Sequence, residues 1–201
     1  MKRITQYNLP LPLSSSLTEG DARFDEQLSY HLKRVGILTY QFCQFLSLPD
    51  KATALVTLGG LFHDIGKMAV APAIINKPGK LNSVELEKMR LHTIYGKIIA
   101  LASPSLKQVA EIIAQHHEQW DGEGYPFELK GKEIHIGARI VSIVDSYDTM
   151  INYRPYRRYV WTPQEAVLEI ERCAGTQFDP YLVQAFVDFM NYVRTFKMVS
   201  N

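Results

Sequence analysis

The chain has 201 residues, 46% of them hydrophobic and 21% charged, so it is long enough to bury a core and has the composition of a soluble globular protein. The formal net charge of +1 argues against a general binder of DNA or RNA polymers, which is usually strongly basic. Two distant cysteines, Cys43 and Cys173, imply no disulfide framework. Because the sequence has no signal-peptide core and no run of about 20 apolar residues, we expect a cytoplasmic protein that does not enter a membrane.

The first 20 residues differ from the rest of the chain. They contain Leu9-Pro10-Leu11-Pro12-Leu13, and prolines at alternate positions prevent a helix. We therefore expect an extended arm over residues 1–20 and one helical domain over residues 21–201.

From Asp21 onward, apolar residues recur at steps of three and four, which predicts a long helix. Leu48-Pro49-Asp50 ends this helix, and a second apolar helix leads to the adjacent pair His63-Asp64. The first stripe includes one histidine among its apolar members: Phe24, Leu28, His31, Val35, Leu38, Phe42 and Phe45.

Capping signals mark most of the later helices. Asn82 with Glu85 predicts a helix that runs through His92 towards Ala102, and Pro104 begins the next, which ends in His116-His117-Glu118. A loop over residues 120–126 presents Tyr125, and a helix follows over about 136–150. Thr162-Pro163 and Asp179-Pro180 begin the last two helices. Strand-like alternation is absent, so the predicted fold is an all-α helical bundle.

The positions of the histidines indicate a metal site. Five of the six fall late in a predicted helix or on its buried face, and two carboxylates lie in apolar helical segments. A lone histidine on an apolar face is more often a satisfied core residue, and a lone His-Asp pair can simply cap a helix. Together the groups exceed the needs of one four-coordinate ion and suit two divalent ions that share a carboxylate, with iron or manganese favoured by the nitrogen and oxygen donors. The set is His31, His63, Asp64, His92, His116, His117 and Asp145.

From about His31 to the C-terminus, the sequence resembles the HD-GYP domains of the HD hydrolase superfamily. A general member of that superfamily shares only the His-Asp core, so the Gly-Tyr-Pro loop indicates the subfamily. The motifs that carry the resemblance are His31-Leu32-Lys33-Arg34-Val35, His63-Asp64-Ile65-Gly66-Lys67, Lys77-Pro78-Gly79-Lys80-Leu81, His92 with Gly96, His116-His117-Glu118, Asp121-Gly122-Glu123-Gly124-Tyr125-Pro126, Arg139-Ile140, Asp145, Asp148 and Arg154-Pro155-Tyr156-Arg157.

The resemblance implies a phosphodiesterase that hydrolyses cyclic di-GMP to pGpG or GMP by attack of a hydroxide that bridges two metal ions. It assigns all seven histidines and aspartates above as metal ligands, with Asp64 as the bridge. Lys67 would lie near the scissile phosphate, although an ion pair with a nearby carboxylate is an alternative role. The nucleotide would contact Tyr125, Arg154 and Arg157, on a loop shaped by Gly122 and Gly124.

Three departures from the family pattern and several alternatives accompany this interpretation. Gln27 replaces a glutamate that accompanies a third metal in some members, so we expect two ions. Glu128 replaces the usual glycine after the Gly-Tyr-Pro motif, and the stretch 148–153 is less rich in small residues. Tyr125 could instead plug its loop, and Arg154 with Arg157 could form a solvated turn. A catalytically weak cyclic dinucleotide receptor, an HD hydrolase of another nucleotide, and a homodimer or signalling partner remain open.

Overall fold

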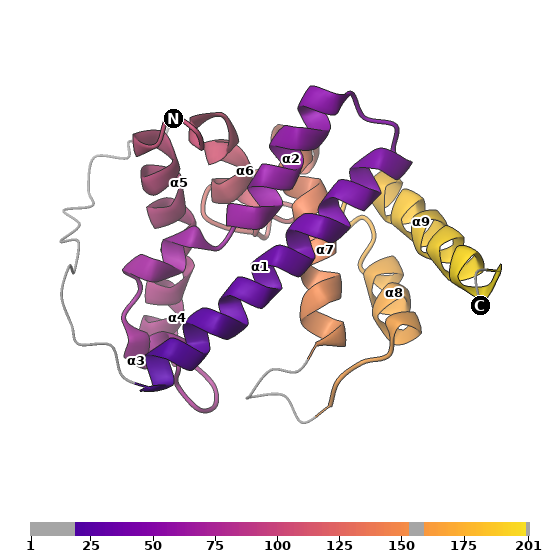
Figure 1. Ribbon diagram of the computed structural model, residues 1–201. Helices are drawn as coiled ribbons and strands as arrows, with labels where there is room; N and C mark the ends of the chain where they lie inside the picture. Colours follow the sequence, from indigo (N-terminus) through magenta and orange to yellow (C-terminus); the bar gives the residue numbers. More distant parts are fainter. Residues whose placement is uncertain (1–18, 153–158, 200–201) are drawn as a thin grey trace.

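The computed structural model describes residues 19–152 and 159–199, and within these ranges the chain forms α-helices and short 3-10 helices without a β-strand (Figure 1). The all-α prediction is therefore confirmed. The elements are α1 (Glu19–Phe45), α2 (Asp50–Phe62), η1 (Ile65–Ala69), α3 (Pro72–Ile75), α4 (Ser83–Arg90), α5 (His92–Ala102), η2 (Lys107–Val109), α6 (Ala110–Gln115), η3 (Gly131–Glu133), α7 (Ile136–Ile151), α8 (Pro163–Arg172) and α9 (Pro180–Val199).

Helix α7 lies at the centre of the bundle, and α1, α2, α6, α8 and α9 all pack against it. Long helix α1 crosses the molecule, with α2 and α7 against it (Figure 1). The sequence explains the central place of α7, because it is apolar on several sides and buries most of its length. Its inward residues are those expected from the sequence: Ile140, Ile143, Val144 and Tyr147.

The predicted capping boxes are present at two helix starts. The side chain of Asn82 accepts from the N–H of Glu85, and Glu85 accepts in return from the N–H of Asn82. Thr162 and Glu165 repeat this exchange at the start of α8. Each box satisfies backbone donors that the first turn of a helix leaves unpaired.

Two helix predictions were wrong in detail. The helix expected from Asn82 to Ala102 is broken at Leu91 into α4 and α5, because the carbonyl of Met89 accepts from the N–H of Leu91 and from Nδ1 of His92. The helix expected from Pro104 begins as a turn and a short 3-10 helix, and α6 starts only at Ala110. The break at Leu91 lies just before His92, and the short helix α6 ends just before His116 and His117, all three of which belong to the candidate site.

Glycines bring η1 against α5. A Cβ atom on Gly66 would lie 1.9 Å from the carbonyl oxygen of His92 and 2.4 Å from the amide nitrogen of Gly96. Only glycine fits there without a backbone shift. This approach places Asp64, just before η1, beside His92 at the start of α5.

The expected arm over residues 1–20 lies almost wholly outside the described residues, and α1 is already helical at Glu19. Both cysteines are free, with Cys43 buried in the core. Within the described ranges, no helix combines the length and the apolar character that a membrane span requires.

Candidate metal centre

The seven histidines and aspartates predicted as metal ligands come together in two adjacent groups. The first group consists of Asp64, His92, His116 and His117, and the second consists of His31, His63 and Asp145. Within each group, one ligand atom per residue lies within 4.8 Å of the others. Five different helix ends or helix faces contribute to the two groups.

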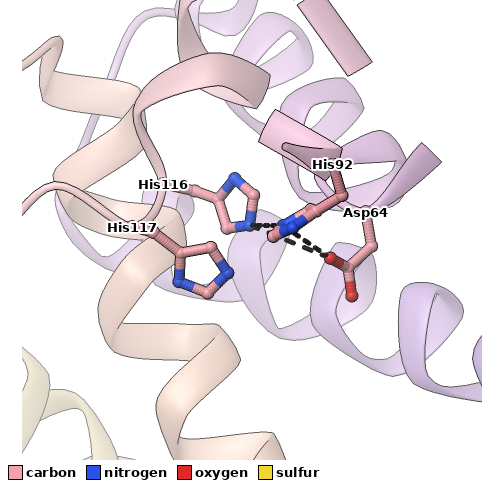
Figure 2. Close-up of side chains that lie close together, drawn as sticks. All are labelled: Asp64, His92, His116 and His117. Carbon is pink, nitrogen blue, oxygen red and sulfur yellow. Dashed lines mark hydrogen bonds and ion pairs between the residues drawn. The ribbon is translucent and has the colours of Figure 1, made fainter. Parts of the chain in front are cut away.

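The first group gathers around the ends of α2, α5 and α6 (Figure 2). Nε2 of His92 lies 3.3 Å from Oδ1 of Asp64 and 3.4 Å from Nε2 of His116. The ring of His117 lies beside the ring of His116, with centroids 4.0 Å apart. His92 and His116 are each 1% exposed, so water contributes little to their environment.

The second group joins α1, the end of α2 and α7. Oδ1 of Asp145 lies 3.1 Å from Nε2 of His31 and 3.6 Å from Nε2 of His63. His31 and His63 are fully buried, whereas the side chain of Asp145 is 16% exposed. Asp145 therefore lies on the side of this group that is open to solvent.

Asp64 connects the two groups through its two oxygens. Its Oδ1 faces Nε2 of His92 at 3.3 Å and Nε2 of His116 at 3.9 Å. Its Oδ2 faces Nε2 of His63 at 3.4 Å and Nε2 of His31 at 3.9 Å. A carboxylate with one oxygen directed to each set of imidazoles has the geometry of a bridging ligand.

Three of the imidazoles are oriented by carbonyl groups of their own helix ends. Because a carbonyl oxygen only accepts, each Nδ1 must carry a proton, and this bond directs Nε2 of each ring to the centre. The bonds run from His63 to Gly60 at 2.8 Å, from His92 to Met89 at 2.7 Å, and from His116 to Ile113 at 2.7 Å.

His31 is oriented differently, by a side chain from another helix. Its Nδ1 lies 2.7 Å from Oδ2 of Asp148 on α7. Arg34 donates to the same carboxylate through two bonds of 2.7 and 2.9 Å, and Asn152 donates at 3.0 Å. Asp148 is 3% exposed, and its ion pair with Arg34 keeps it an acceptor, so Nε2 of His31 is free to face the centre.

The two carboxylates of the centre are held in the ionised form. Burial opposes ionisation, but Lys67 and His63 bring the pKa of Asp64 well below its ordinary value. Hydrogen bonds from His31 and His63 do the same for the pKa of Asp145. Ionised carboxylates are the form that binds a divalent cation.

The imidazoles of the two groups differ in their pKa. Burial and the neighbouring imidazoles lower the pKa of His116 well below its ordinary value, and burial with the nearby His92 lowers that of His117 to about 3. Burial acts in the same direction on His63, but Asp64 and Asp145 outweigh it and raise that pKa to about 10. The first group therefore presents neutral imidazoles, which is the ligand form.

The donor set fits divalent cations. Nε2 of His92 and Nε2 of His116 face each other at 3.4 Å, although the protons of both rings are on Nδ1. Two lone pairs at this distance repel, and a shared cation turns the repulsion into attraction. In addition, Nε2 of His63 and Oδ1 of Asp64 are buried without a hydrogen-bond partner in the described part of the chain. Such groups are costly unless they bind a metal or a partner.

Lys67 lies beside the bridge position. Its Nζ is 2.5 Å from Oδ2 of Asp64, and its side chain is 22% exposed. The ion pair that the sequence left as an alternative role is therefore present. The ammonium group also lies at the edge of the centre, within the first turn after Asp64.

The Gly-Tyr-Pro loop is attached to the first group through Tyr125. The ring of Tyr125 stacks on the ring of His117 with centroids 4.9 Å apart, and the guanidinium of Arg90 lies 5.1 Å from the centroid of the tyrosine ring. This loop conformation requires glycine at position 124, because a Cβ on Gly124 would lie 2.2 Å from the backbone nitrogen of Gln119. Tyr125 thus both covers His117 and fixes the loop.

Glu118 holds the following turn of the loop. Its carboxylate accepts from the N–H groups of Phe127 and Leu129 at 2.7 and 3.0 Å. Glu128, between these two residues, has a φ of +56°. This left-handed conformation favours glycine, which explains why a glycine is usual at this place in the family pattern.

The structure leaves some predicted residues untested and adds others. Arg154 and Arg157 lie outside the described residues. Gly122 lies in the Gly-Tyr-Pro loop with a φ of +92°, a backbone conformation that favours glycine. The sequence reasoning assigned no role to Arg90, Glu118 or the Arg34–Asp148 pair. The sequence did contain a signal for the Arg34–Asp148 pair. His31 and Arg34 are three residues apart and share a helix face, and so do Asp145 and Asp148.

This helical bundle with a buried histidine and aspartate centre places the chain in a known class. The model of the HD domain matches residues 22–182, so the protein belongs to the HD domain family. The predicted membership of the HD superfamily is thus confirmed, and its relatives include cyclic dinucleotide phosphodiesterases.

Two curated relatives illustrate the similarity. The cyclic di-GMP phosphodiesterase of Thermotoga maritima is 38% identical over 165 residues, which cover 81% of this chain and 45% of the relative. The 3'3'-cGAMP-specific phosphodiesterase 2 of Vibrio cholerae is 35% identical over 160 residues, which cover 79% of this chain and 30% of the relative. The chain thus spans less than half the length of these relatives.

Solved structures share the fold. Bd1817, a HDG"Y"P protein from Bdellovibrio bacteriovorus, gives a TM-score of 0.66 at 24% identity and covers 83% of this chain and 53% of its own. The HD domain of the L. monocytogenes phosphodiesterase PgpH, in complex with cyclic di-AMP, gives a TM-score of 0.57 at 16% identity and covers 87% of this chain and 92% of its own.

Proposed function

We propose that this protein is a metal-dependent phosphodiesterase that hydrolyses cyclic di-GMP to pGpG, GMP or both. The observation that carries the proposal is the orientation of the Asp64 carboxylate, whose two oxygens face two different sets of imidazoles. The similarity to relatives named as cyclic di-GMP phosphodiesterases supports the choice of substrate.

In this proposal the two groups would hold two divalent ions, iron or manganese. His92, His116 and His117 would bind one ion, His31, His63 and Asp145 would bind the other, and Asp64 would serve both. When bound, such ions supply positive charge for a phosphate oxygen and a water of lowered pKa.

The residues of the chain prepare the centre for this chemistry. The backbone carbonyls and Asp148 orient the imidazoles, so little reorganisation is needed when charge develops. Lys67 acts as a catalytic group that stabilises negative charge on the phosphate or on the leaving ribose 3′ oxygen. Hydrolysis adds water across the phosphorus–oxygen bond, and the leaving oxygen takes the proton.

We infer that the Gly-Tyr-Pro loop and the basic residues Arg154 and Arg157 contact the substrate. Tyr125 packs against the nucleotide at the edge of the first group, and Gly122 and Gly124 shape the loop. Arg154 and Arg157 contact phosphate or a guanine edge, in a fork geometry that lysine does not reproduce. Arg154→Ala should raise KM more than it lowers kcat if this role is right.

A turnover assay tests the proposal. Protein prepared without oxygen is incubated with cyclic di-GMP, the products are separated by chromatography, and the metal content is measured on the same sample. Linear product that scales with about two ions per chain supports the dinuclear enzyme. Binding of cyclic di-GMP without cleavage would instead indicate a receptor.

A hybrid substrate is the second candidate. Relatives of similar identity are named as 3'3'-cGAMP-specific phosphodiesterases. Parallel assays with 3'3'-cGAMP and cyclic di-GMP distinguish the two by the ratio of kcat/KM.

A further inference from the structure

His117 differs from the other four imidazoles of the metal centre, because its ring makes no hydrogen bond within the described residues. The other four rings each have Nδ1 bonded to a backbone carbonyl or to a carboxylate. In Figure 2, dashed lines join the other three residues drawn, and none reaches the ring of His117. Helix α6 ends at Gln115, so the half-buried His117 lies in the turn that follows it. Other contacts must orient its ring.

The Gly-Tyr-Pro loop supplies these contacts through Tyr125. The two rings stack with centroids 4.9 Å apart and planes inclined by 24°, and the backbone N–H of Tyr125 donates to the carbonyl of His117 at 3.2 Å. The stack restrains the tilt of the imidazole. The hydroxyl of Tyr125 makes no hydrogen bond within the part of the chain that the structure describes. The orientation of the tyrosine ring therefore depends on what packs against it.

Arg90 packs against this ring. The carbon of its guanidinium lies 5.1 Å from the centroid of Tyr125, within the distance of about 6 Å over which a cation is attracted to an aromatic face. Its Nη1 also donates to Glu87 at 2.9 Å, but Glu87 is 69% exposed, and such a surface ion pair contributes little. Its Nε is buried without a hydrogen-bond partner among the described residues. The tyrosine ring is thus the main partner of the guanidinium.

The break between α4 and α5 makes this contact possible. Arg90 is the last residue of α4, and His92 is the first residue of α5. In one continuous helix, residues two positions apart do not share a face, so Arg90 would point away from the centre when His92 points into it. The turn at Leu91 instead allows His92 to join the ligands while Arg90 lies over Tyr125.

We propose that Arg90 is a positioning residue of the metal centre, which holds the ring of Tyr125 on His117 and thereby fixes His117 in the orientation that binds the first ion. The inference rests on the proposed function, because it takes the first group to bind a divalent ion, but it does not depend on the identity of the substrate. It gives a role to a residue outside the motifs that carry the family resemblance.

Binding of Mn²⁺ tests the inference. Metal-free protein is titrated with Mn²⁺ in a calorimeter for the unaltered chain, Arg90→Met, Arg90→Lys and Lys88→Met. Lys88 is exposed on the same helix, so Lys88→Met removes the same charge without touching the ring and is the matched control. Asp148→Asn, which alters the anchor of His31, identifies the binding step that belongs to the second group.

Arg90→Met should bind Mn²⁺ about fivefold more weakly at the first group and with unchanged affinity at the second. Arg90→Lys should keep most of the affinity, because an ammonium group is also attracted by the ring, and Lys88→Met should match the unaltered chain. Unchanged affinity in Arg90→Met would overturn the inference. So would an increase, which would show that the guanidinium only repels the ions, or an equal loss from both groups, which would show a general loss of structure.

A double-mutant cycle tests whether the effect passes through the ring. Tyr125→Leu should weaken the first site roughly tenfold or more, and Arg90→Met should cause no further loss in that background. Tyr125→Phe keeps the ring, so it should keep the Mn²⁺ affinity and its dependence on Arg90. Additive losses from Tyr125→Leu and Arg90→Met would contradict the inference.

Turnover of cyclic di-GMP is followed with the same proteins, so that the two proposals can fail separately. If the unaltered chain binds two Mn²⁺ ions and Arg90→Met weakens only the first site, absence of turnover counts against the proposed function alone. Turnover with a first site that is insensitive to Arg90→Met counts against the role of Arg90 alone. An unaltered chain that binds no Mn²⁺ would overturn both.

Discussion

Four imidazoles of the centre are held by hydrogen bonds in two contrasting ways. His63, His92 and His116 each bond to a carbonyl three residues earlier in the chain. His31 bonds to Asp148, which lies 117 residues later on another helix. The first kind of anchor is built by a helix end, and the second exists only when α1 and α7 pack together.

The contrast indicates where the centre is vulnerable. A carbonyl anchor remains when any side chain is replaced, so it changes only if the backbone moves. The anchor of His31 depends on the Asp148 carboxylate, which Arg34 and Asn152 hold in place. Changes to the shared bridge, the backbone and the Asp148 anchor should therefore have separable effects.

The largest effect is expected from Asp64→Ala, which removes the group that faces both sets of imidazoles. Both groups should lose metal, and turnover of cyclic di-GMP should fall below detection, because two ions no longer share a ligand. Metal content and product formation are measured together. Asp188→Ala, at an exposed position on α9, is the control, and full metal content in Asp64→Ala would contradict the bridging role.

Gly66→Ala tests the backbone anchors. The added Cβ would meet the carbonyl of His92 at 1.9 Å, so η1 and α5 must separate, at a cost of about 3 kcal/mol in unfolding free energy. Urea denaturation measures the loss. Gly79→Ala is the control, because nothing lies within 4 Å of its Cβ and only its φ of +101° opposes the substitution, which costs about 1 kcal/mol. Equal losses in the two variants would show that the close approach is unimportant.

Asp148→Asn tests the side-chain anchor with little change of volume. The second group should bind metal about 10–100-fold more weakly, because the amide has one acceptor oxygen and no charge for the donors His31, Arg34 and Asn152, so the ring of His31 is held less firmly. The first group, anchored on carbonyls, should keep its affinity. Chelator titration that resolves the two sites measures this, with Asp188→Asn as control. A uniform loss from both groups would show that the anchors are not independent.

The smallest effect concerns the loop rather than the centre. Glu128→Gly should stabilise the fold by about 1 kcal/mol, since glycine adopts a φ of +56° without the steric penalty. Thermal unfolding measures the gain. Ser47→Gly, at a φ of +55° between α1 and α2, should give a similar gain without any change in turnover. If neither variant is stabilised, the left-handed conformation carries no strain.

The sequence reasoning succeeded where the signal was local. The capping boxes at Asn82 and Thr162 and the extent of α7 followed from propensity and periodicity. It failed at Leu91, because a side-chain bond from His92 to a backbone carbonyl interrupts a helix that the pattern continues. It also assigned no role to Asp148, since no local pattern states which residue a buried carboxylate meets.

By itself, the sequence determined most of the long helices, the capping boxes at Asn82 and Thr162 and the identity of seven candidate ligands, because these depend on neighbours within a few residues. Only the tertiary structure decided that Asp64 directs one oxygen to each group and that Asp148 orients His31. The physical reason is that these relations join residues on different helices. Packing of α1, α2, α6 and α8 against α7, and of α5 against η1 and α6, fixes their distances, and no short-range pattern in the chain encodes them.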